Sequence, residues 1–331
     1  MSKSNITAGS RPSKSLQGDE HDVTQRVREF YERFHFPGKR PPDQDGLILI
    51  RRFARSLKPF MQKQRTSPIR VLDAGCGTGN TTISLARQFP EVEFLGVDIS
   101  EPSLSRARQV INEEPLTNLR FRKWNLMNPM LDEGQFDIVL CLGVLHHTAD
   151  MGRVLTNLNG VLKSEGELYL WIYGRHGRYR HSLNQRFLRM LLKTKPRPAD
   201  AVHIAREFAY CARNSSILDD LLGPAPAGSL HRKVLKDPTW IADQFLNPKE
   251  TLLDMEELIA LVTASGFQID QWLGISNDVS SHLNSAELTE RFEQLPRDQQ
   301  LIALDLLLKL ERYFVVIRKA EDKKAETRCI R

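Results

Sequence analysis

The stretch VLDAGCGTGN at residues 71–80 decides the fold, because it joins an apolar strand to a helix through three closely spaced glycines. Such glycines let the backbone turn tightly and let a ligand approach closely. A phosphate-binding P-loop needs Lys followed by Ser or Thr after its last glycine, and no such pair follows here. A dinucleotide-binding turn needs glycine at position 80, where the chain has Asn80. Neither phosphate-binding pattern therefore fits this turn.

One acidic residue, Asp73, lies inside the strand, two residues before the first glycine. A carboxylate aimed at the turn repels a pyrophosphate and attracts a positively charged ligand. S-adenosylmethionine carries an α-ammonium group and a sulfonium group, and it has no phosphate. The turn therefore favours a cationic nucleoside without phosphate, with a plain tight turn as the structural alternative.

Apolar segments of strand length recur along the chain and alternate with helical segments. Strands are expected at 69–75, 92–98, 118–126, 136–144, 166–174, 267–274 and 312–319. Strands that alternate with helices of about 10–15 residues form βαβ units and a parallel sheet. The pattern thus predicts an α/β fold with a doubly wound sheet, whose ligands bind at the carboxyl ends of the strands.

The composition is that of a globular protein, with 331 residues, 40% of them apolar and 27% charged. The longest apolar runs have the length of strands, so no membrane span is expected. The N-terminus is rich in Ser and basic residues without an apolar run, which favours a disordered tail over a transit peptide. The four cysteines fit no zinc or disulfide spacing, so we expect no metal site and a cytoplasmic location.

The basic excess is concentrated in one segment. Residues 175–197 hold eight Lys or Arg and no Asp or Glu, against totals of 47 basic and 41 acidic residues. Such a segment suggests an acidic partner, such as a phosphorylated or carboxylated small molecule, a carrier protein or RNA, with a solvated helix face as the alternative. Only Tyr179 and Phe187 could stack on bases, so nucleic acid is not favoured.

The motif h-D-x-G-x-G-x-G at the turn resembles that of the class I S-adenosylmethionine-dependent methyltransferases. The resemblance continues at GVDIS (96–100), WNL (124–126) and FDIVLCLGVLHH (136–147). Two further stretches, FYERFHFPG and ADQFLNP, are similar to those of a bacterial branch of these enzymes. The resemblance implies a Rossmann-like, seven-stranded, mostly parallel sheet and S-adenosyl-L-methionine as the cofactor. It implies methyl transfer to oxygen, nitrogen or carbon of a small molecule, for which the basic segment suggests an acidic character.

The resemblance also implies roles for individual residues at the strand ends. Asp73 would contact the methionine ammonium group, Asp98 would take both ribose hydroxyls, and Asn125 would face the adenine amino group or cap a turn. The other expected cofactor contacts are Gly75, Cys76, Gly77, Gly79, Ile99, Leu126, Leu142 and Gly143.

Candidate catalytic residues follow the fourth and fifth strands. His147, and less so His146, could act as a general base. Tyr173, at the end of the fifth strand, faces the same opening of the site and is a further candidate. Capping or packing is the alternative role for each. An acceptor that is already a carboxylate, a thiolate or a carbanion would need no base.

Elements added to the core would select the substrate, and four residues on them are candidate substrate contacts: Tyr31, Phe34, Arg175 and Arg178. The expected organisation is a disordered tail (1–23), an N-terminal helical lid (24–66, with helices at 24–36 and about 46–63), a cofactor-binding core (67–174), a substrate-side insertion with the basic segment (175–250), and the remainder of the core (251–331) with a helical insertion at 277–311.

Two alternatives to a small-molecule enzyme stay open. One is methylation of RNA or protein, although the Asn/Asp-Pro-Pro-Tyr/Phe signature of base-amine methylation is absent after the fourth strand. The other is a non-catalytic assembly or scaffold protein with this fold. No pattern in the sequence sets an oligomeric state.

Overall fold

A computed structural model describes residues 14–36, 53, 68–130, 132–192, 197–211, 236–275 and 279–320. Seven strands form one sheet in the order β3-β2-β1-β4-β5-β7-β6, and β7 runs antiparallel to both of its neighbours. The strands are β1 (Ile69–Ala74), β2 (Val92–Asp98), β3 (Leu119–Lys123), β4 (Phe136–Leu142), β5 (Leu162–Tyr173), β6 (Phe267–Leu273) and β7 (Arg312–Lys319). The predicted α/β class and mostly parallel sheet are confirmed.

Helices cover both faces of the sheet, because successive strand residues point to opposite faces. Val71 and Leu140 pack towards α3 (Asn80–Gln88) and α4 (Glu101–Glu113). Leu72 and Val139 pack towards α5 (Met151–Val161) and α11 (Met255–Ala264). Every one of these four side chains is fully buried. The near-continuous apolar strands of the sequence therefore match a sheet buried on both faces.

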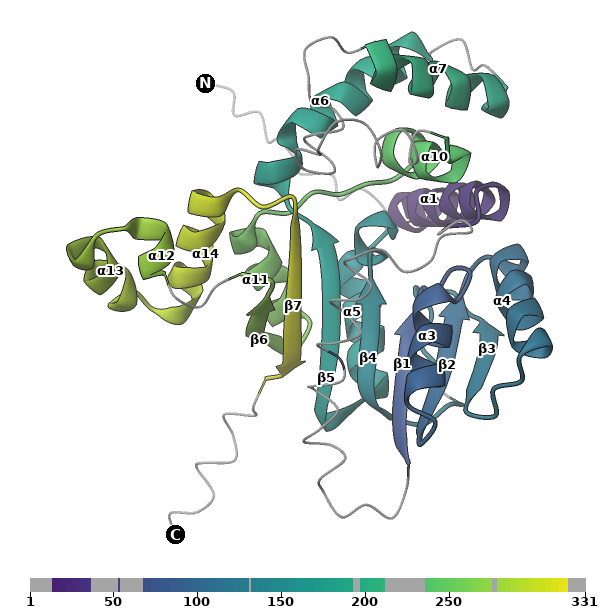
Figure 1. Ribbon diagram of the computed structural model, residues 1–331, viewed down its shortest axis with the longest axis horizontal. Coiled ribbons are helices and arrows are strands. Elements are labelled where there is room, and N and C mark those ends of the chain that lie inside the picture. The colour runs from purple at the N-terminus through teal and green to yellow at the C-terminus, as the bar shows by residue number, and fades with distance from the viewer. Residues whose placement is uncertain are drawn as a thin grey trace, which may run out of the picture.

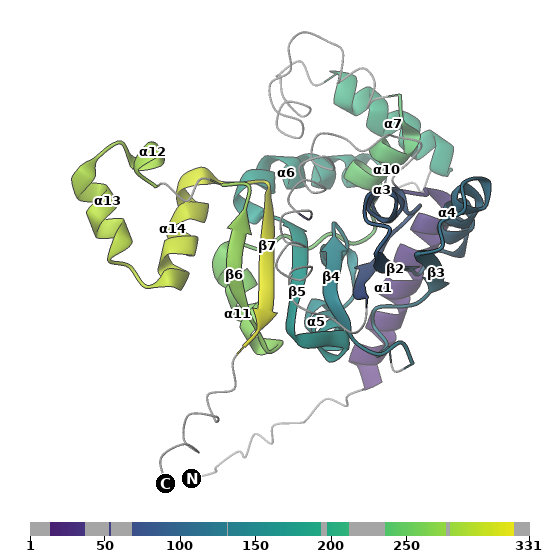
Figure 2. The ribbon, with the colours of Figure 1, turned by 60° about the horizontal axis from the view of Figure 1, so that its bottom comes forward.

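Further helices lie outside this three-layer core: α1 (Lys14–Arg33), α6 (Arg175–Leu191), α7 (Pro198–Cys211), α10 (Pro238–Leu246), α12 (Ser280–Leu283), α13 (Ala286–Glu293) and α14 (Arg297–Leu308). Figure 1 shows α1, α6 and α10 gathered above the carboxyl ends of β4 and β5. In Figure 2, α12 to α14 extend away from the core beyond β6. None of the described helices combines the length and the apolar character needed to cross a membrane. The added helices therefore fall into two groups, one over the ligand-binding edge and one beside the sheet.

The N-terminal boundary differs from the prediction, because α1 begins at Lys14 inside the expected disordered tail of residues 1–23. The first turns of α1 carry little apolar periodicity, and a tertiary ion pair between Glu20 and Arg153 of α5 (3.4 Å) supports them instead. The second predicted helix, at about 46–63, lies outside the described residues apart from Phe53. That side chain is fully buried beside Phe94 and Tyr169.

Other expectations also fall partly outside the described residues. This holds for residues 193–196 of the basic segment and 212–235 of the substrate-side insertion. Near the other end of the chain, α12, α13 and α14 lie within the predicted helical insertion at 277–311. The strand β5 begins at Leu162, four residues before its predicted start, because it follows α5 without a loop.

The core makes a testable prediction about stability. We expect Leu168→Ala on β5, where the side chain is 0% exposed, to lower the free energy of unfolding by about 2–5 kcal/mol. Leu306→Ala on α14 is the matched control, because its side chain is 55% exposed and should cost less than about 0.5 kcal/mol. Urea unfolding followed by circular dichroism measures both. Equal losses of unfolding free energy in the two variants would contradict the placement of Leu168 in the core.

Candidate cofactor and acceptor site

The glycine turn closes onto the end of β2 through backbone hydrogen bonds. The amides of Gly75 and Cys76 both donate to the carbonyl oxygen of Val97, at 2.8 and 2.9 Å. Gly75 has φ of +88°, and a Cβ atom there would lie 2.4 Å from a methyl carbon of Val144. Only glycine therefore fits the first position of the turn without a rearrangement.

Asp98, at the end of β2, receives two backbone hydrogen bonds. Its Oδ2 accepts from the amide of Gly77 at 2.9 Å, and its Oδ1 accepts from the amide of Ser100 at 2.8 Å. Burial raises the pKa of this carboxyl, and the backbone donors partly offset that effect. Each oxygen keeps a further lone pair, so the carboxylate can still accept hydrogen bonds from a vicinal diol.

Asp73, at the end of the neighbouring strand β1, is 3% exposed. The hydroxyl of Thr82 on α3 donates to its Oδ2 at 2.5 Å. Burial raises the pKa of Asp73 to about 6; the Thr82 hydrogen bond lowers it, and the nearby charge of Asp98 raises it. The two carboxylates therefore lie at the same edge of the sheet and repel one another. Thr82 is a site residue that the sequence analysis missed.

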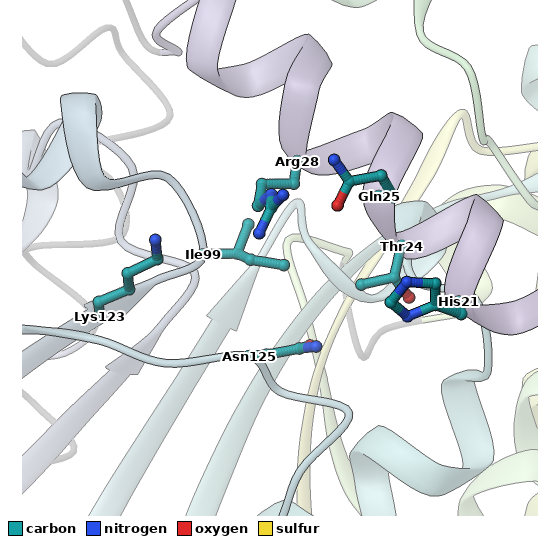
Figure 3. A pocket seen from close by; sticks show the side chains of 7 residues that line it. All are labelled: His21, Thr24, Gln25, Arg28, Ile99, Lys123 and Asn125. Atoms are coloured by element: carbon teal, nitrogen blue, oxygen red, sulfur yellow. The ribbon is translucent and has the colours of Figure 1, made fainter.

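A cavity of about 160 Å³ lies beside the end of β3. Figure 3 shows Ile99 and Lys123 to its left, Asn125 below it, and side chains of α1 above it and to its right. The α1 residues are His21, Thr24, Gln25 and Arg28. Ile99 and Asn125 were predicted here, whereas the four α1 residues were not. The cavity thus lies beside Ile99, the residue that follows Asp98 in the chain.

The acceptor side is formed by the short helix η1 (Leu145–His147) after β4. The Nδ1 of His147 lies 2.6 Å from the carbonyl oxygen of Lys249, so this nitrogen carries the hydrogen that is donated. In the neutral ring, Nε2 is then the proton acceptor. The ring of His147 lies 6.0 Å from that of Tyr31, measured between centroids. His146 is fully buried, and within the described residues neither of its ring nitrogens has a hydrogen-bond partner.

The hydroxyl of Tyr173 is bound by protein groups. It accepts from the Nε2 of Gln244 at 3.1 Å, and the guanidinium of Arg178 lies 3.5 Å from the ring centroid. Burial raises the pKa of Tyr173, with the charge of Arg178 acting in the opposite direction. These contacts favour the packing role over the chemical role that the sequence analysis also considered.

Both arginines expected to contact substrate are paired inside the protein. Arg175 binds the carboxylates of Asp254 at 2.7 Å and Glu257 at 2.6 Å. Arg178 is buried and pairs with Glu250 at 3.2 Å. Their charges are therefore balanced by acidic residues that are distant in the sequence, which removes the argument for an acidic substrate at these two positions.

The two aromatic residues proposed to contact substrate have separate environments. Tyr31 donates to Oδ1 of Asp243 at 3.1 Å and accepts from Nδ2 of Asn247 at 2.9 Å, which joins α1 to the end of α10. Phe34 instead packs with the apolar residues of α6, α7 and α10. Phe34 therefore holds the helix in place, and only Tyr31 lies beside His147.

Comparisons with known proteins agree with this geometry. The family described as "Methyltransferase domain" matches residues 72–168. An uncharacterized protein of Synechococcus sp., syc1184_c, is 27% identical over 311 residues, covering 86% of this chain and 69% of that protein. Magnesium-protoporphyrin O-methyltransferase of Rhodobacter capsulatus is 41% identical over 91 residues, covering 27% of this chain and 39% of that protein. PKMT2 from Rickettsia typhi in complex with AdoHcy shares the fold, with a TM-score of 0.58 and 14% identity over 76% of this chain and 49% of that chain.

Residues 72–168 are thus similar to the methyltransferase domain of the class I S-adenosylmethionine-dependent methyltransferases, a family whose cofactor is S-adenosyl-L-methionine. Apart from the Synechococcus protein, this chain spans only 39–42% of the length of the curated relatives that it matches. The similarity is therefore strongest in the cofactor-binding core.

The site fits S-adenosyl-L-methionine in its charge and its hydrogen-bonding groups. Asp73 offers a buried anion for the ammonium group, and Asp98 offers two acceptor oxygens for the ribose. Cys76 is buried in the turn, where its sulfur would lie 3.1 Å from a Cβ atom added at Gly96. Gly143 has φ of +73° and donates its amide to the carbonyl of Trp171 at 3.0 Å, which shapes the loop after β4.

Three of the predicted cofactor contacts have further partners in the fold, and for Asn125 the expected turn capping is among them. The Oδ1 of Asn125 accepts from the amide of Met127 at 3.0 Å, so this residue caps its turn as well as lining the cavity. The side chain of Leu126 packs in the core on the α5 side, so only its backbone can face the cofactor. Leu142 is half-buried against the α3 and α4 side of the sheet.

Replacing Asp73 should have opposite effects on folding stability and on cofactor affinity. Because its pKa in the folded protein, about 6, exceeds the usual 3.8, ionisation costs folding free energy as the pH rises through this range. At pH 8, Asp73→Asn should therefore stabilise the free protein by about 1–3 kcal/mol. The same variant should bind S-adenosylmethionine more weakly, because the partner of the ammonium group is lost.

The wild type should also bind S-adenosylmethionine more weakly below about pH 6, where Asp73 is protonated. Calorimetry from pH 5 to 8 measures this, and Asp73→Asn should show no such step. Thermal unfolding at pH 8 gives the stability. A variant that is both less stable and equally tight in binding would contradict the assignment of Asp73.

Proposed function

We propose that this protein transfers the methyl group of S-adenosylmethionine to an oxygen, nitrogen or carbon nucleophile of a small molecule. The observation that carries the proposal is the pair formed by the buried carboxylate of Asp73 and the partly buried carboxylate of Asp98, at adjacent strand ends around a glycine turn. The enclosure of His147 beneath α1 and α10 supports a small acceptor, because bulky polymers need an open surface. We also propose a cytoplasmic location, where the buried thiols of Cys76 and Cys141 stay reduced.

Methyl transfer requires the protein mainly to align the acceptor atom with the methyl carbon and the sulfur. When bound, the cofactor supplies an activated methyl group, and its sulfonium becomes a neutral thioether as the bond to the acceptor forms. Holding the reacting atoms in line contributes about 7–11 kcal/mol to lowering the barrier. Asp73 would hold the methionine ammonium group and Asp98 the ribose hydroxyls, and α1 would exclude water from the adenine end.

A general base completes the reaction when the nucleophile carries a proton. We assign this role to His147, whose Nδ1–H is donated to Lys249 so that Nε2 can take the proton of an O–H or N–H group. The proton then passes to solvent when the product leaves. Such catalysis is worth about 10²–10⁴-fold in rate. Tyr173 is assigned a packing role under Arg178.

The two alternatives are weaker on specific grounds. An RNA or protein acceptor would have to reach His147, which is 4% exposed and contacted by Tyr31 of α1 and by the backbone of Lys249, in the segment after α10. A non-catalytic scaffold would not need the buried anion of Asp73, which costs folding free energy at neutral pH. Both alternatives nevertheless predict different outcomes in the experiments below.

Cofactor binding tests the first half of the proposal. We expect calorimetry to give micromolar affinity for S-adenosylmethionine, and we expect Asp98→Ala to weaken it by about 100-fold, because two hydrogen bonds to a carboxylate are lost. Asp132→Ala is the control, since this exposed carboxylate pairs with Arg122 away from the turn. Well-folded wild-type protein that takes up no cofactor would favour the scaffold.

The second half of the proposal, transfer to a small molecule, is tested with the separated fractions of a cell extract. We expect protein supplied with methyl-labelled S-adenosylmethionine to label the small-molecule fraction of a cell extract and to leave the RNA and protein fractions unlabelled. His147→Gln should bind the cofactor within about twofold of the wild type and transfer at least about 100-fold more slowly. Label in the RNA or protein fraction would replace the small-molecule proposal with the corresponding alternative.

A further inference from the structure

Helix α10 places buried polar residues on the acceptor side that the reaction above does not use. Asp243, Gln244 and Asn247 are 5%, 7% and 8% exposed, and they lie beside Tyr31 and Tyr173. Buried polar groups require partners, because each unpaired one costs free energy. The partners of Asp243 therefore show what this carboxylate can do.

Among the described residues, the two hydrogen-bond donors to Asp243 are neutral. Its Oδ1 accepts from the hydroxyl of Tyr31 at 3.1 Å, and its Oδ2 accepts from the Nε2 of Gln244 at 3.0 Å. The nearby cation, Arg178, pairs with Glu250, whose charge balances it. Among the ion pairs between described residues, none includes Asp243. Each carboxylate oxygen keeps a lone pair for another donor.

Asp243 lies within electrostatic range of the proposed base, His147. Burial raises the pKa of Asp243, and the largest opposing effect comes from His147. Glu250 raises this pKa and Arg178 lowers it, and these two act together as a pair. Tyr31 lies between α10 and η1, with its hydroxyl on Asp243 and its ring 6.0 Å from that of His147. A buried carboxylate without a counterion is costly, so a cationic or hydrogen-donating ligand would relieve it.

We propose that Asp243, supported by Tyr31 and Gln244, binds the N–H or O–H group of the methyl acceptor beside His147. The inference rests on the proposed function. It narrows the acceptor to amines, alcohols and phenols, and it disfavours carboxylates and phosphates, which the buried anion repels. During transfer, the acceptor N or O forms the bond to the methyl carbon, the S–C bond breaks with its electron pair on sulfur, and the acceptor proton goes to Nε2 of His147.

A purely structural role makes a different prediction. If Asp243 only anchors Tyr31 of α1, then its negative charge is unnecessary, because an amide oxygen accepts the same hydrogen bond. Asp243→Asn therefore removes the charge and keeps the anchor. Tyr31→Phe does the reverse, since it removes the anchoring hydroxyl and keeps the charge on Asp243.

Two inhibitors that differ in charge at the methyl position can test for a negative charge of the protein there. The test does not require the acceptor to be identified. Sinefungin carries an ammonium group where the transferred methyl stands, whereas S-adenosylhomocysteine has no charge there. We expect the wild type to bind sinefungin about tenfold more tightly than S-adenosylhomocysteine, as for one charge-assisted hydrogen bond. Asp243→Asn should abolish this preference and leave S-adenosylhomocysteine affinity within about twofold. Tyr31→Phe should keep the preference, as should the control Asp270→Asn, whose carboxylate pairs with Arg318 on β7.

The possible outcomes distinguish failure of the role proposed for Asp243 from failure of the proposed function. Tight binding of both inhibitors with an unchanged ratio in Asp243→Asn overturns the role of Asp243 and leaves cofactor binding intact. A wild type that binds both equally overturns it as well, and this result needs no variant to fold. Failure of the well-folded wild type to bind either inhibitor would overturn the proposed function itself.

Discussion

The closure of the glycine turn onto the end of β2 is the constraint on which the rest of the site depends. Two amides of the turn bind the carbonyl of Val97, and a third binds the carboxylate of Asp98. This closure needs positive φ at Gly75 and leaves no room for a Cβ atom beside Val144. Because β1 and β2 are adjacent in the sheet, the same closure brings Asp73 and Asp98 to one edge. A ligand between them must tolerate two carboxylates.

The parts of the fold that the sequence predicts are those set by local patterns. Strand periodicity located all seven strands, and the spacing of Asp73 and Asp98 around the glycines indicated their shared edge. Capping is a closer test: the N-cap of α11 is Asp254, and Glu257 completes a capping box. An acidic cluster in a short stretch leaves more than one capping register, and tertiary contacts with Arg175 select between them.

The parts that the sequence did not predict depend on pairs that are far apart along the chain. The basic segment looked unpaired because its partners lie 72 to 82 residues later, in Glu250, Asp254 and Glu257. The start of α1 was missed for the same reason, because its first turns rely on Arg153. Asp243 carried no signal of its own in the stretch ADQFLNP. Its importance follows only from the balance of charges after folding, in which Arg178 is matched by Glu250 and Asp243 is left with neutral partners.

Helix α1 touches both ends of the site, and this has a consequence for how ligands enter. Gln25 lines the cavity at the adenine end, whereas Tyr31 reaches Asp243 at the acceptor end. Six residues of helix separate them, a rise of about 9 Å along one rigid element. Opening the adenine end by displacing α1 therefore also pulls the Tyr31 hydroxyl from Asp243 and Asn247. Because those hydrogen bonds hold α1 in place, an acceptor bound at Asp243 strengthens the cover over the cofactor, and cofactor exchange is easiest after the methylated product has left.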